Sequence, residues 1–233
     1  LPPGKGVEIK IYVPNGEKLA EKTLNKKLGI TGGISIIGTT GIVEPMSIDA
    51  FKKSLSPQID IAKAAGFEEL VLVPGRISEK NAIKAGIPDD AVIQMGNFVG
   101  YILNECTRKG VKKVLLYGRT GKLVKVSTGI FDTHSKTSDA RLETIAANAA
   151  SQGAGKETVN KILDANTTEE AKEILKREGL LSVFDTIAEK ASTHATEYTE
   201  HKLDVGTIIT SRKGEIIGKD QNSRRSRWAK LLS

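Results

Sequence analysis

Short apolar segments that end in glycine-containing turns recur along this 233-residue chain, and this pattern restricts the fold classes that the chain can adopt. Three of them are Leu70–Val73, Ala91–Gln94 and Val114–Tyr117, and a helical pattern follows each of the first two. Strand and helix alternate at about 20–25 residues, which is typical of parallel βαβ units. The segments are apolar throughout, as expected for strands that helices cover on both faces. We therefore predict an α/β fold with a mostly parallel sheet and helices on both faces.

The rest of the first half is assigned from the same patterns. Alternating residues predict a strand at 7–13, and a short buried strand is predicted at 34–37. Helices are predicted at 17–25, 47–65, 78–85 and 98–109, and residues 122–127 have the pattern of a strand. The predicted sheet thus extends over about residues 7–127.

The second half is predicted to be helical before it closes with two strands. Helical spacing covers 138–152, 156–166, 168–178 and 182–193, and the third of these helices follows a capping signal at Thr167. Strands at 206–210 and 214–218 flank a charged turn and predict a β-hairpin. We expect a sheet domain at 1–136, followed at 137–233 by a helical segment and closing hairpin that complete the same domain or a second one.

Cysteine content and hydropathy indicate in which cellular compartment the protein is expected. Cys106 is the single cysteine, so a disulfide within the chain and a thiolate zinc site are both excluded. No apolar run approaches the roughly 20 residues that span a bilayer, and the first residues have no signal-peptide pattern. A cytoplasmic protein without a membrane partner or a bound metal is expected, and the sequence leaves open whether it forms a homo-oligomer.

The net charge of +7 favours an anionic partner, such as nucleic acid, phosphate or a polycarboxylate, although an excess of lysine for solubility explains it equally well. Basic residues crowd the segment from Arg212 to Lys230, which allows a nucleic-acid-binding module as one interpretation. Aromatic residues make up only 4% of the chain, and this weakens any case for stacking on bases.

Four polar, glycine-containing turns follow predicted strands and are expected at the carboxyl edge of the sheet, where ligands bind in open α/β folds. The dense segment Thr31–Gly41 fits neither a dinucleotide fingerprint nor a P-loop. Its threonines suit a carboxylate, a ribose or an ammonium group. The four turns are Gly38-Thr39-Thr40-Gly41, Pro74-Gly75-Arg76, Met95-Gly96-Asn97-Phe98 and Gly118-Arg119-Thr120-Gly121-Lys122.

A further loop, Asp132-Thr133-His134-Ser135, gathers titratable and hydroxyl side chains. Histidine transfers protons near neutral pH, so His134 is a candidate base with Asp132 as its orienting partner. The structural alternative is that Asp132 and Thr133 cap a helix near Ser138 and that His134 packs beneath it.

Several segments resemble the CbiD family of cobalamin biosynthesis. The likeness is strong from about Gly6 to Gly153 and weaker beyond. Members carry a further amino-terminal region with a Thr-Gly-Tyr-Thr-Thr-Gly-like start, which we expect to add ligand contacts. The segments that carry the resemblance are Leu28-Gly-Ile-Thr-Gly-Gly-Ile-Ser-Ile-Ile-Gly-Thr-Thr-Gly-Ile-Val-Glu-Pro-Met46, Val73-Pro-Gly-Arg76, Gln94-Met-Gly-Asn-Phe-Val-Gly100, Gly121-Lys122-Leu, Phe131-Asp-Thr-His-Ser135 and Asp139-Ala-Arg141.

The resemblance implies methyl transfer from S-adenosylmethionine to ring carbon C-1 of cobalt-precorrin-5B, which gives cobalt-precorrin-6A in the anaerobic route. The cobalt belongs to this corrinoid substrate, whose acetate and propionate groups suit a basic protein. The expected cofactor-binding residues are Gly38, Thr39, Thr40, Gly41, Gly75, Gly96, Asn97 and Phe98, and the expected carboxylate-binding residues are Arg76, Lys122 and Arg141. His134 and Asp132 are the expected catalytic pair. A nucleotide-dependent oxidoreductase and the nucleic-acid-binding module are the alternatives.

Overall fold

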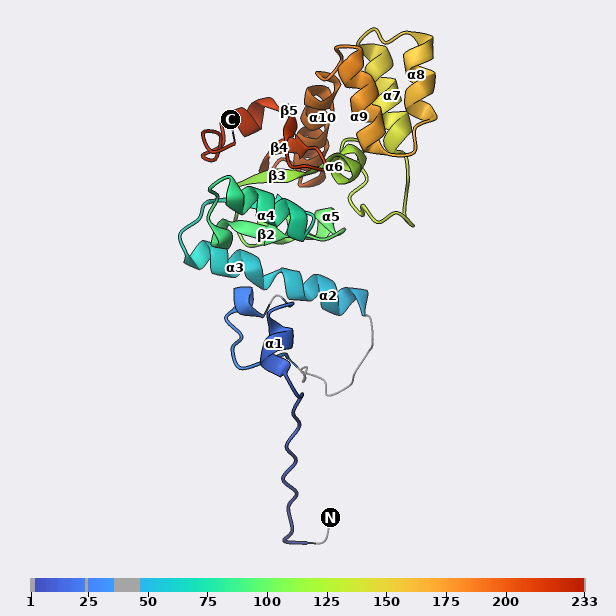
Figure 1. The fold of residues 1–233 in the computed structure, drawn as a ribbon. Coiled ribbons are helices and arrows are strands. Elements are labelled where there is room, and N and C mark those ends of the chain that lie inside the picture. Colours follow the sequence, from blue (N-terminus) through green and yellow to red (C-terminus); the bar gives the residue numbers. More distant parts are fainter. Residues whose placement is uncertain (1–2, 24, 36–46, 233) are drawn as a thin grey trace. The chain divides into compact units, whose positions relative to one another are not determined.

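The computed structural model describes residues 3–23, 25–35 and 47–232, and the chain divides into two compact units, Leu1–Ser47 and Ile48–Ser233 (Figure 1). The Gly38-Thr39-Thr40-Gly41 turn and the second half of the predicted strand at 34–37 lie outside the described residues. Each unit is considered by itself below.

The described part of the first unit contains one short helix, α1 (Gly16–Ala20), and a 3-10 turn, η1 (Lys26–Leu28). The predicted strand at 7–13 is wrong, because this segment forms no strand pairing with other described residues and Ile9 is 77% exposed. A strand needs a neighbour to accept and donate its backbone hydrogen bonds, and apolar alternation alone does not supply one.

The second unit contains a five-stranded sheet in the order β2-β1-β3-β4-β5. Its first four strands are parallel, and β5 runs antiparallel to β4, so the mostly parallel sheet and the closing hairpin are both confirmed. The three apolar segments Leu70–Val73, Ala91–Gln94 and Val114–Tyr117 fall in the one sheet, as predicted. The strands are β1 (Glu69–Val73), β2 (Val92–Gln94), β3 (Lys113–Arg119), β4 (Asp204–Thr210) and β5 (Ile216–Lys219).

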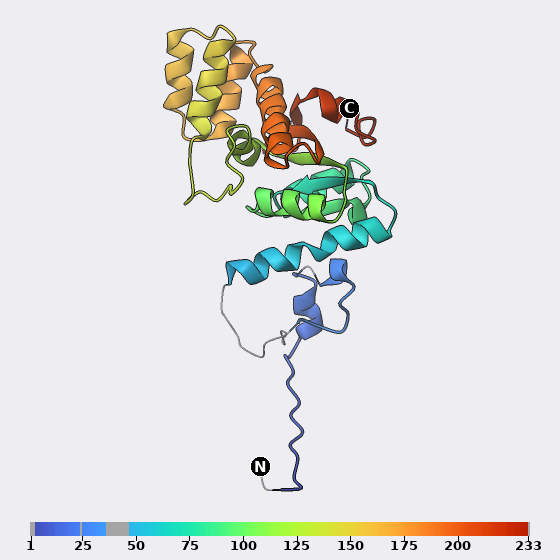
Figure 2. The ribbon, with the colours of Figure 1, turned by 180° about the vertical axis from the view of Figure 1, so that it is seen from behind.

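Helices cover both faces of this sheet. Helix α4 lies in front of the sheet in Figure 1, and α5 lies in front of it in Figure 2, which shows the fold from behind. The helix predicted at 47–65 is confirmed but divides at Pro57, which has no N–H to continue the hydrogen-bond ladder and instead begins a new helix. The helices of this part are α2 (Ile48–Leu55), α3 (Pro57–Ala64), α4 (Arg76–Lys84) and α5 (Val99–Arg108), with a 3-10 turn, η2 (Asp89–Ala91), before β2.

The segment 122–127, predicted as a strand, is instead part of helix α6 (Thr120–Val126). Strand β3 runs on through Gly118 to Arg119, and α6 follows without a loop. Leu123, Val124 and Val126 are fully buried. Since α6 packs against α10 and α7, burial against neighbouring helices overrides the strand preference of its valines.

The remaining predicted helices are confirmed. Helices α7, α8 and α9 pack together, and α10 packs against β4 and β5 (Figure 1). The Thr167 side chain accepts a hydrogen bond of 3.2 Å from the Glu170 N–H and caps α9, as its sequence signal predicted. The confirmed helices are α7 (Arg141–Ser151), α8 (Lys156–Leu163), α9 (Thr168–Arg177) and α10 (Val183–Tyr198). A short helix that was not predicted, α11 (Gln221–Arg224), follows β5.

Strands β4 and β5 extend the sheet of β1–β3, so both halves of the chain contribute to one compact unit. A domain boundary at residue 136 stays a prediction. No described helix is long and apolar enough to cross a membrane. Cys106 is buried, and burial raises the pKa of its thiol to about 12, so it serves as a packing residue.

Candidate functional site

A cavity of about 440 Å³ opens at the carboxyl ends of β3 and β4, the edge where open α/β sheets bind ligands. Arg119 ends β3, Thr210 ends β4, and the two are register partners. Helices α6, α7 and α9, the loop with Thr133 and Ser135, and the turn after β4 complete the lining. Its charged residues are Arg119, Lys122, Lys125, Arg141, Arg212 and Glu169.

Positive charge dominates this cavity, with five cations facing one carboxylate. The carboxylate of Glu169 is already engaged, because it pairs with Lys172 and accepts a hydrogen bond from the backbone N–H of Arg212. Within the described part of the chain, the guanidinium groups of Arg119 and Arg212 have no hydrogen-bond or ion-pair partner. The cavity is therefore suited to a ligand with several negative charges.

Lys122 joins the cavity to two neighbouring loops. Its Nζ donates to Oδ1 of Asn97 at 2.5 Å and to the carbonyl oxygen of Thr133 at 3.1 Å. Burial, together with the nearby charges of Lys125 and Arg141, lowers the pKa of Lys122. A bound carboxylate would compensate this positive charge.

Lys125 and Arg141 fix the loop between α6 and α7. Lys125 is buried, and its Nζ donates to the carbonyl oxygens of Thr133 and Ser138. Arg141 makes a two-point contact with Asp139, with N–O distances of 2.5 and 2.8 Å, and this hydrogen bonding lowers the pKa of the Asp139 carboxyl. Arg141 thus reaches the cavity from the first turn of α7.

The structure brings Lys122 and Arg141, two of the three expected carboxylate-binding residues, to one cavity. Arg76 does not line it. Arg76 is the exposed first residue of α4, at the carboxyl end of the neighbouring strand β1. The three residues share an edge of the sheet but not a cavity.

The described glycine turns of the expected cofactor site lie after β1 and β2. A Cβ added to Gly75 would meet no atom within 4 Å, so the backbone there is open to close approach. Gly96 has φ of +60°, in the left-handed region that favours glycine. The ring of Phe98 lies 5.9 Å from that of Phe51, while Lys122 holds Asn97. Gly38, Thr39, Thr40 and Gly41 lie outside the described residues.

The loop of Asp132 and His134 is exposed, and its hydrogen bonds involve the backbone. Oδ1 of Asp132 accepts from the His134 backbone N–H at 3.1 Å, and Nδ1 of His134 accepts from the Lys136 backbone N–H at 3.1 Å. The structural alternative is wrong, since Ala140 is the N-cap residue of α7 and His134 is not packed beneath it. An accepting Nδ1 leaves the proton of a neutral ring on Nε2. As placed, His134 presents a donor.

Four charged residues of the cavity were absent from the sequence-based site. Arg119 stood in a turn that the sequence singled out, and Lys125 was missed because its segment was assigned to a strand. Glu169 and Arg212 had signals only for a helix start and a hairpin turn. Their place at the cavity depends on the pairing of β4 with β3, which no local pattern reveals. Among the described residues, no group of three or more His, Cys, Asp or Glu side chains could hold a metal ion.

Comparison with known proteins identifies relatives over most of the chain. The family models "CbiD" and "CbiD, C-terminal domain" match residues 1–45 and 132–221. A protein of Moorella thermoacetica is 50% identical over 226 residues, which cover 96% of this chain and 62% of that protein. A protein of Methanocaldococcus jannaschii is 45% identical over 214 residues, which cover 91% of this chain and 59% of that protein.

A third relative, from Methanococcus maripaludis strain C7, is 47% identical over 215 residues, 91% of this chain and 58% of that protein. All three are named cobalt-precorrin-5B C(1)-methyltransferase. The chain thus spans less than two thirds of the length of the curated relatives it matches. No solved structure matches it.

Proposed function

The chain belongs to the CbiD family, and from this premise we propose that the protein transfers a methyl group from S-adenosylmethionine to C-1 of cobalt-precorrin-5B in cobalamin biosynthesis. The proposed product is cobalt-precorrin-6A. A cytoplasmic location is part of this proposal and rests on the single, buried Cys106.

The observation that carries the proposal is the cavity lined by five cations and a single engaged carboxylate. The corrinoid substrate is a macrocycle edged with acetate and propionate groups. Arg119 and Arg212 provide guanidinium groups, which bind carboxylates in two-point geometry. Arg141 is already paired with Asp139 through Nε and Nη2 and offers Nη1 for a further contact. Lys122 adds a cation whose pKa is lowered by burial first and by the neighbouring charges of Lys125 and Arg141 second, and a bound carboxylate would stabilise its charged form.

The methyl donor fits the same edge of the sheet but not this cavity. Its sulfonium group is a cation, and five cations would repel it. We assign it to the turns that follow β1 and β2, where Gly75 leaves open space and the aromatic ring of Phe98 lies beside Phe51 and the Lys52 ammonium. The donor supplies an electrophilic methyl group, and the protein contributes by aligning it with the corrinoid carbon. For Gly38, Thr39, Thr40 and Gly41 a role in binding the donor stays a prediction from the family resemblance.

The proposed activity is tested on the complete protein in which this sequence occurs, with cobalt-precorrin-5B and methyl-labelled S-adenosylmethionine. We expect a corrinoid product one methyl group heavier and S-adenosylhomocysteine in equal amount. A folded protein that binds S-adenosylhomocysteine and the corrinoid but forms no methylated product contradicts the proposed function.

His134 is the proposed base that completes methylation, with Asp132 holding its loop. In this role Nδ1 of His134 gives up its hydrogen bond from the Lys136 backbone N–H and accepts the proton of the methylated ring instead. We expect His134→Asn to lower kcat about 100-fold or more, as for loss of general-base catalysis, while the melting temperature changes little because the side chain is exposed. Thermal unfolding and turnover measured on the same sample separate the two effects. Lys136→Ala is the matched control on this loop, since its contact with His134 is through the backbone N–H. A His134→Asn rate within threefold of the unsubstituted enzyme rules out the catalytic role.

Neither alternative function gains support from the fold. The basic residues of the 212–230 segment do not form one surface. Arg212 lines the cavity at the carboxyl edge of the sheet, whereas Arg225 and Arg227 line a second cavity with Lys112 at the amino end of β3. The relatives compared above carry a methyltransferase name and not that of an oxidoreductase.

A further inference from the structure

Two arginines that line the cavity were not among the carboxylate-binding residues expected from the sequence. Arg119 is the last residue of β3, and Arg212 follows the end of β4 by two residues. These strands are adjacent and parallel, with Arg119 in register with Thr210. Neighbouring strands lie about 4.8 Å apart, so both side chains start from neighbouring points on one edge of the sheet.

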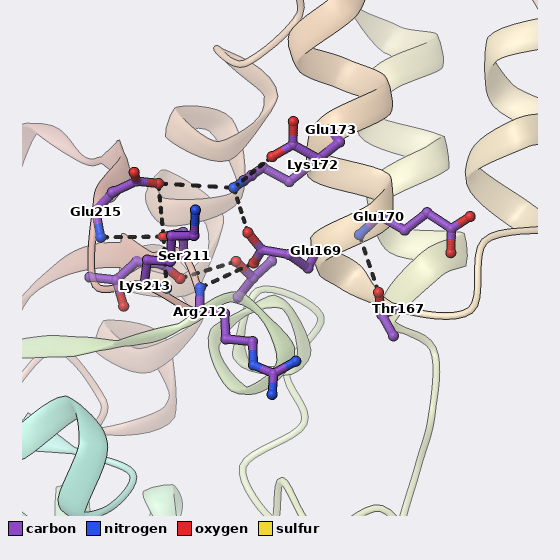
Figure 3. A network of polar contacts seen from close by, with 11 residues as sticks. Thr167, Glu169, Glu170, Lys172, Glu173, Ser211, Arg212, Lys213 and Glu215 are labelled. Carbon is purple, nitrogen blue, oxygen red and sulfur yellow. Dashed lines mark hydrogen bonds and ion pairs between the residues drawn. The ribbon is translucent and has the colours of Figure 1, made fainter.

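The turn that carries Arg212 is anchored to helix α9. The backbone N–H of Arg212 donates to Oε2 of Glu169 at 3.0 Å. In Figure 3 the Arg212 side chain extends away from the surrounding acidic residues, and no dashed line reaches its guanidinium group. The anchor therefore holds the backbone of Arg212 and leaves its charge available to a ligand.

A buried lysine, Lys172, forms an ion pair with the glutamate that anchors the Arg212 backbone. The Lys172 side chain is 8% exposed and its Nζ pairs with Oε1 of Glu169, the oxygen that does not contact Arg212. The same ammonium lies 3.0 Å from Glu173 and 4.0 Å from Glu215, and Glu215 accepts from the Ser211 hydroxyl at 3.2 Å (Figure 3). One cation thus links α9 to both sides of the turn.

We propose that Arg119 and Arg212 form a second carboxylate-binding subsite, distinct from Lys122 and Arg141, and that Lys172 positions Arg212 through Glu169. This inference rests on the proposed function, because its ligand is the same polycarboxylate macrocycle. Two arginines with no partner among the described residues receive neighbouring acid groups of the ring. Arg119 and Arg212 are binding residues in this scheme, and Lys172 is a positioning residue.

The subsite is tested by binding of uroporphyrin, an available tetrapyrrole with eight carboxylates, measured by fluorescence on the complete protein. We expect Arg119→Gln and Arg212→Gln each to raise Kd about tenfold, since each removes one charge-assisted contact. Lys176→Met, an exposed lysine of α9 that does not line the cavity, serves as control and keeps Kd within twofold. Uroporphyrin binding that is unchanged in both arginine variants overturns the subsite.

The positioning role is tested by a double-mutant cycle. Lys172→Met is expected to raise Kd about as much as Arg212→Gln, and the double variant no more than twofold beyond either, because both changes remove one interaction. Glu173→Gln removes another contact of Lys172 without touching the Arg212 anchor, and its Kd stays within twofold. If the Kd increases of the two single variants multiply in the double variant, the positioning role is overturned. If Lys172→Met does not fold, Glu169→Ala tests the same link, and an unchanged Kd there overturns it.

Turnover separates this inference from the proposed function. In the methyl-transfer assay we expect Arg212→Gln and Lys172→Met to raise KM for the corrinoid about tenfold with kcat within twofold, as for loss of uniform binding. Normal methyl transfer with an unchanged KM in Arg212→Gln overturns the subsite and leaves the proposed function standing. Weakened uroporphyrin binding in a protein without methyl transfer supports the subsite and contradicts the proposed function.

Discussion

Gly218→Ala is expected to lower the free energy of unfolding by about 3 kcal/mol, the largest stability effect we anticipate in this chain. Gly218 lies in β5, where the strand packs against α10. A Cβ at this position would lie 2.4 Å from the carbonyl oxygen and 2.8 Å from the Cβ of Phe184. Phe184 is itself fully buried in α10, so neither backbone can yield without separating the helix from the sheet.

Chemical denaturation of the purified protein measures this effect. Gly155→Ala is the matched control, because a Cβ there would meet nothing within 4 Å and φ is −66°. Its cost is expected to stay below about 1 kcal/mol, the usual range for a residue at a helix N-cap. Equal stability of the two variants would show that β5 does not pack against α10 as described.

Lys122→Met is expected to raise KM for the corrinoid by about 10–100-fold, the largest effect on activity that we assign to substrate binding. Methionine keeps the length and apolar stem of lysine but removes the charge and the hydrogen bonds to Asn97 and Thr133. Steady-state kinetics on the complete protein measure the change. Lys176→Met is again the control, with KM expected within twofold. A Lys122→Met enzyme with unaltered KM would remove Lys122 from the proposed binding site.

Lys122 also gives the stability a pH dependence of defined sign. Its folded-state pKa lies below the ordinary value of 10.5, with burial as the main cause. Between these two pKa values the unfolded chain binds more protons, so rising pH favours the folded state. We expect the stability of the unsubstituted protein relative to Lys122→Met to increase as pH rises toward 10.5. If the stability difference between the two proteins stays constant or falls over this pH range, the Lys122 ammonium is not partly buried among other cations as described.

Local sequence patterns specify the centre of this fold well. The segments 70–73, 91–94 and 114–117 are apolar on both faces and are bounded by glycine or proline, so strand is the one regular structure that suits their length and surroundings. The helices between them carry 3.6-residue periodicity, and the Thr167 cap follows from the chemistry of its own first turn. These features depend on residues a few positions apart in the chain, so they can be predicted without a structure.

The same reasoning failed where distant contacts decide the outcome. Residues 7–13 alternate like a strand but have no partner strand among the described residues. Val124 and Val126 are helical because they are buried in α6, which packs against α7 and α10. The cavity depends on β4 pairing with β3 across 84 intervening residues, from 120 to 203. That pairing brings Arg212 and Glu169 to the cavity of Lys122. Lys122 and Arg141 could be chosen from motif resemblance, but their shared cavity and its excess of positive charge arise only from non-local packing, which no pattern along the chain encodes.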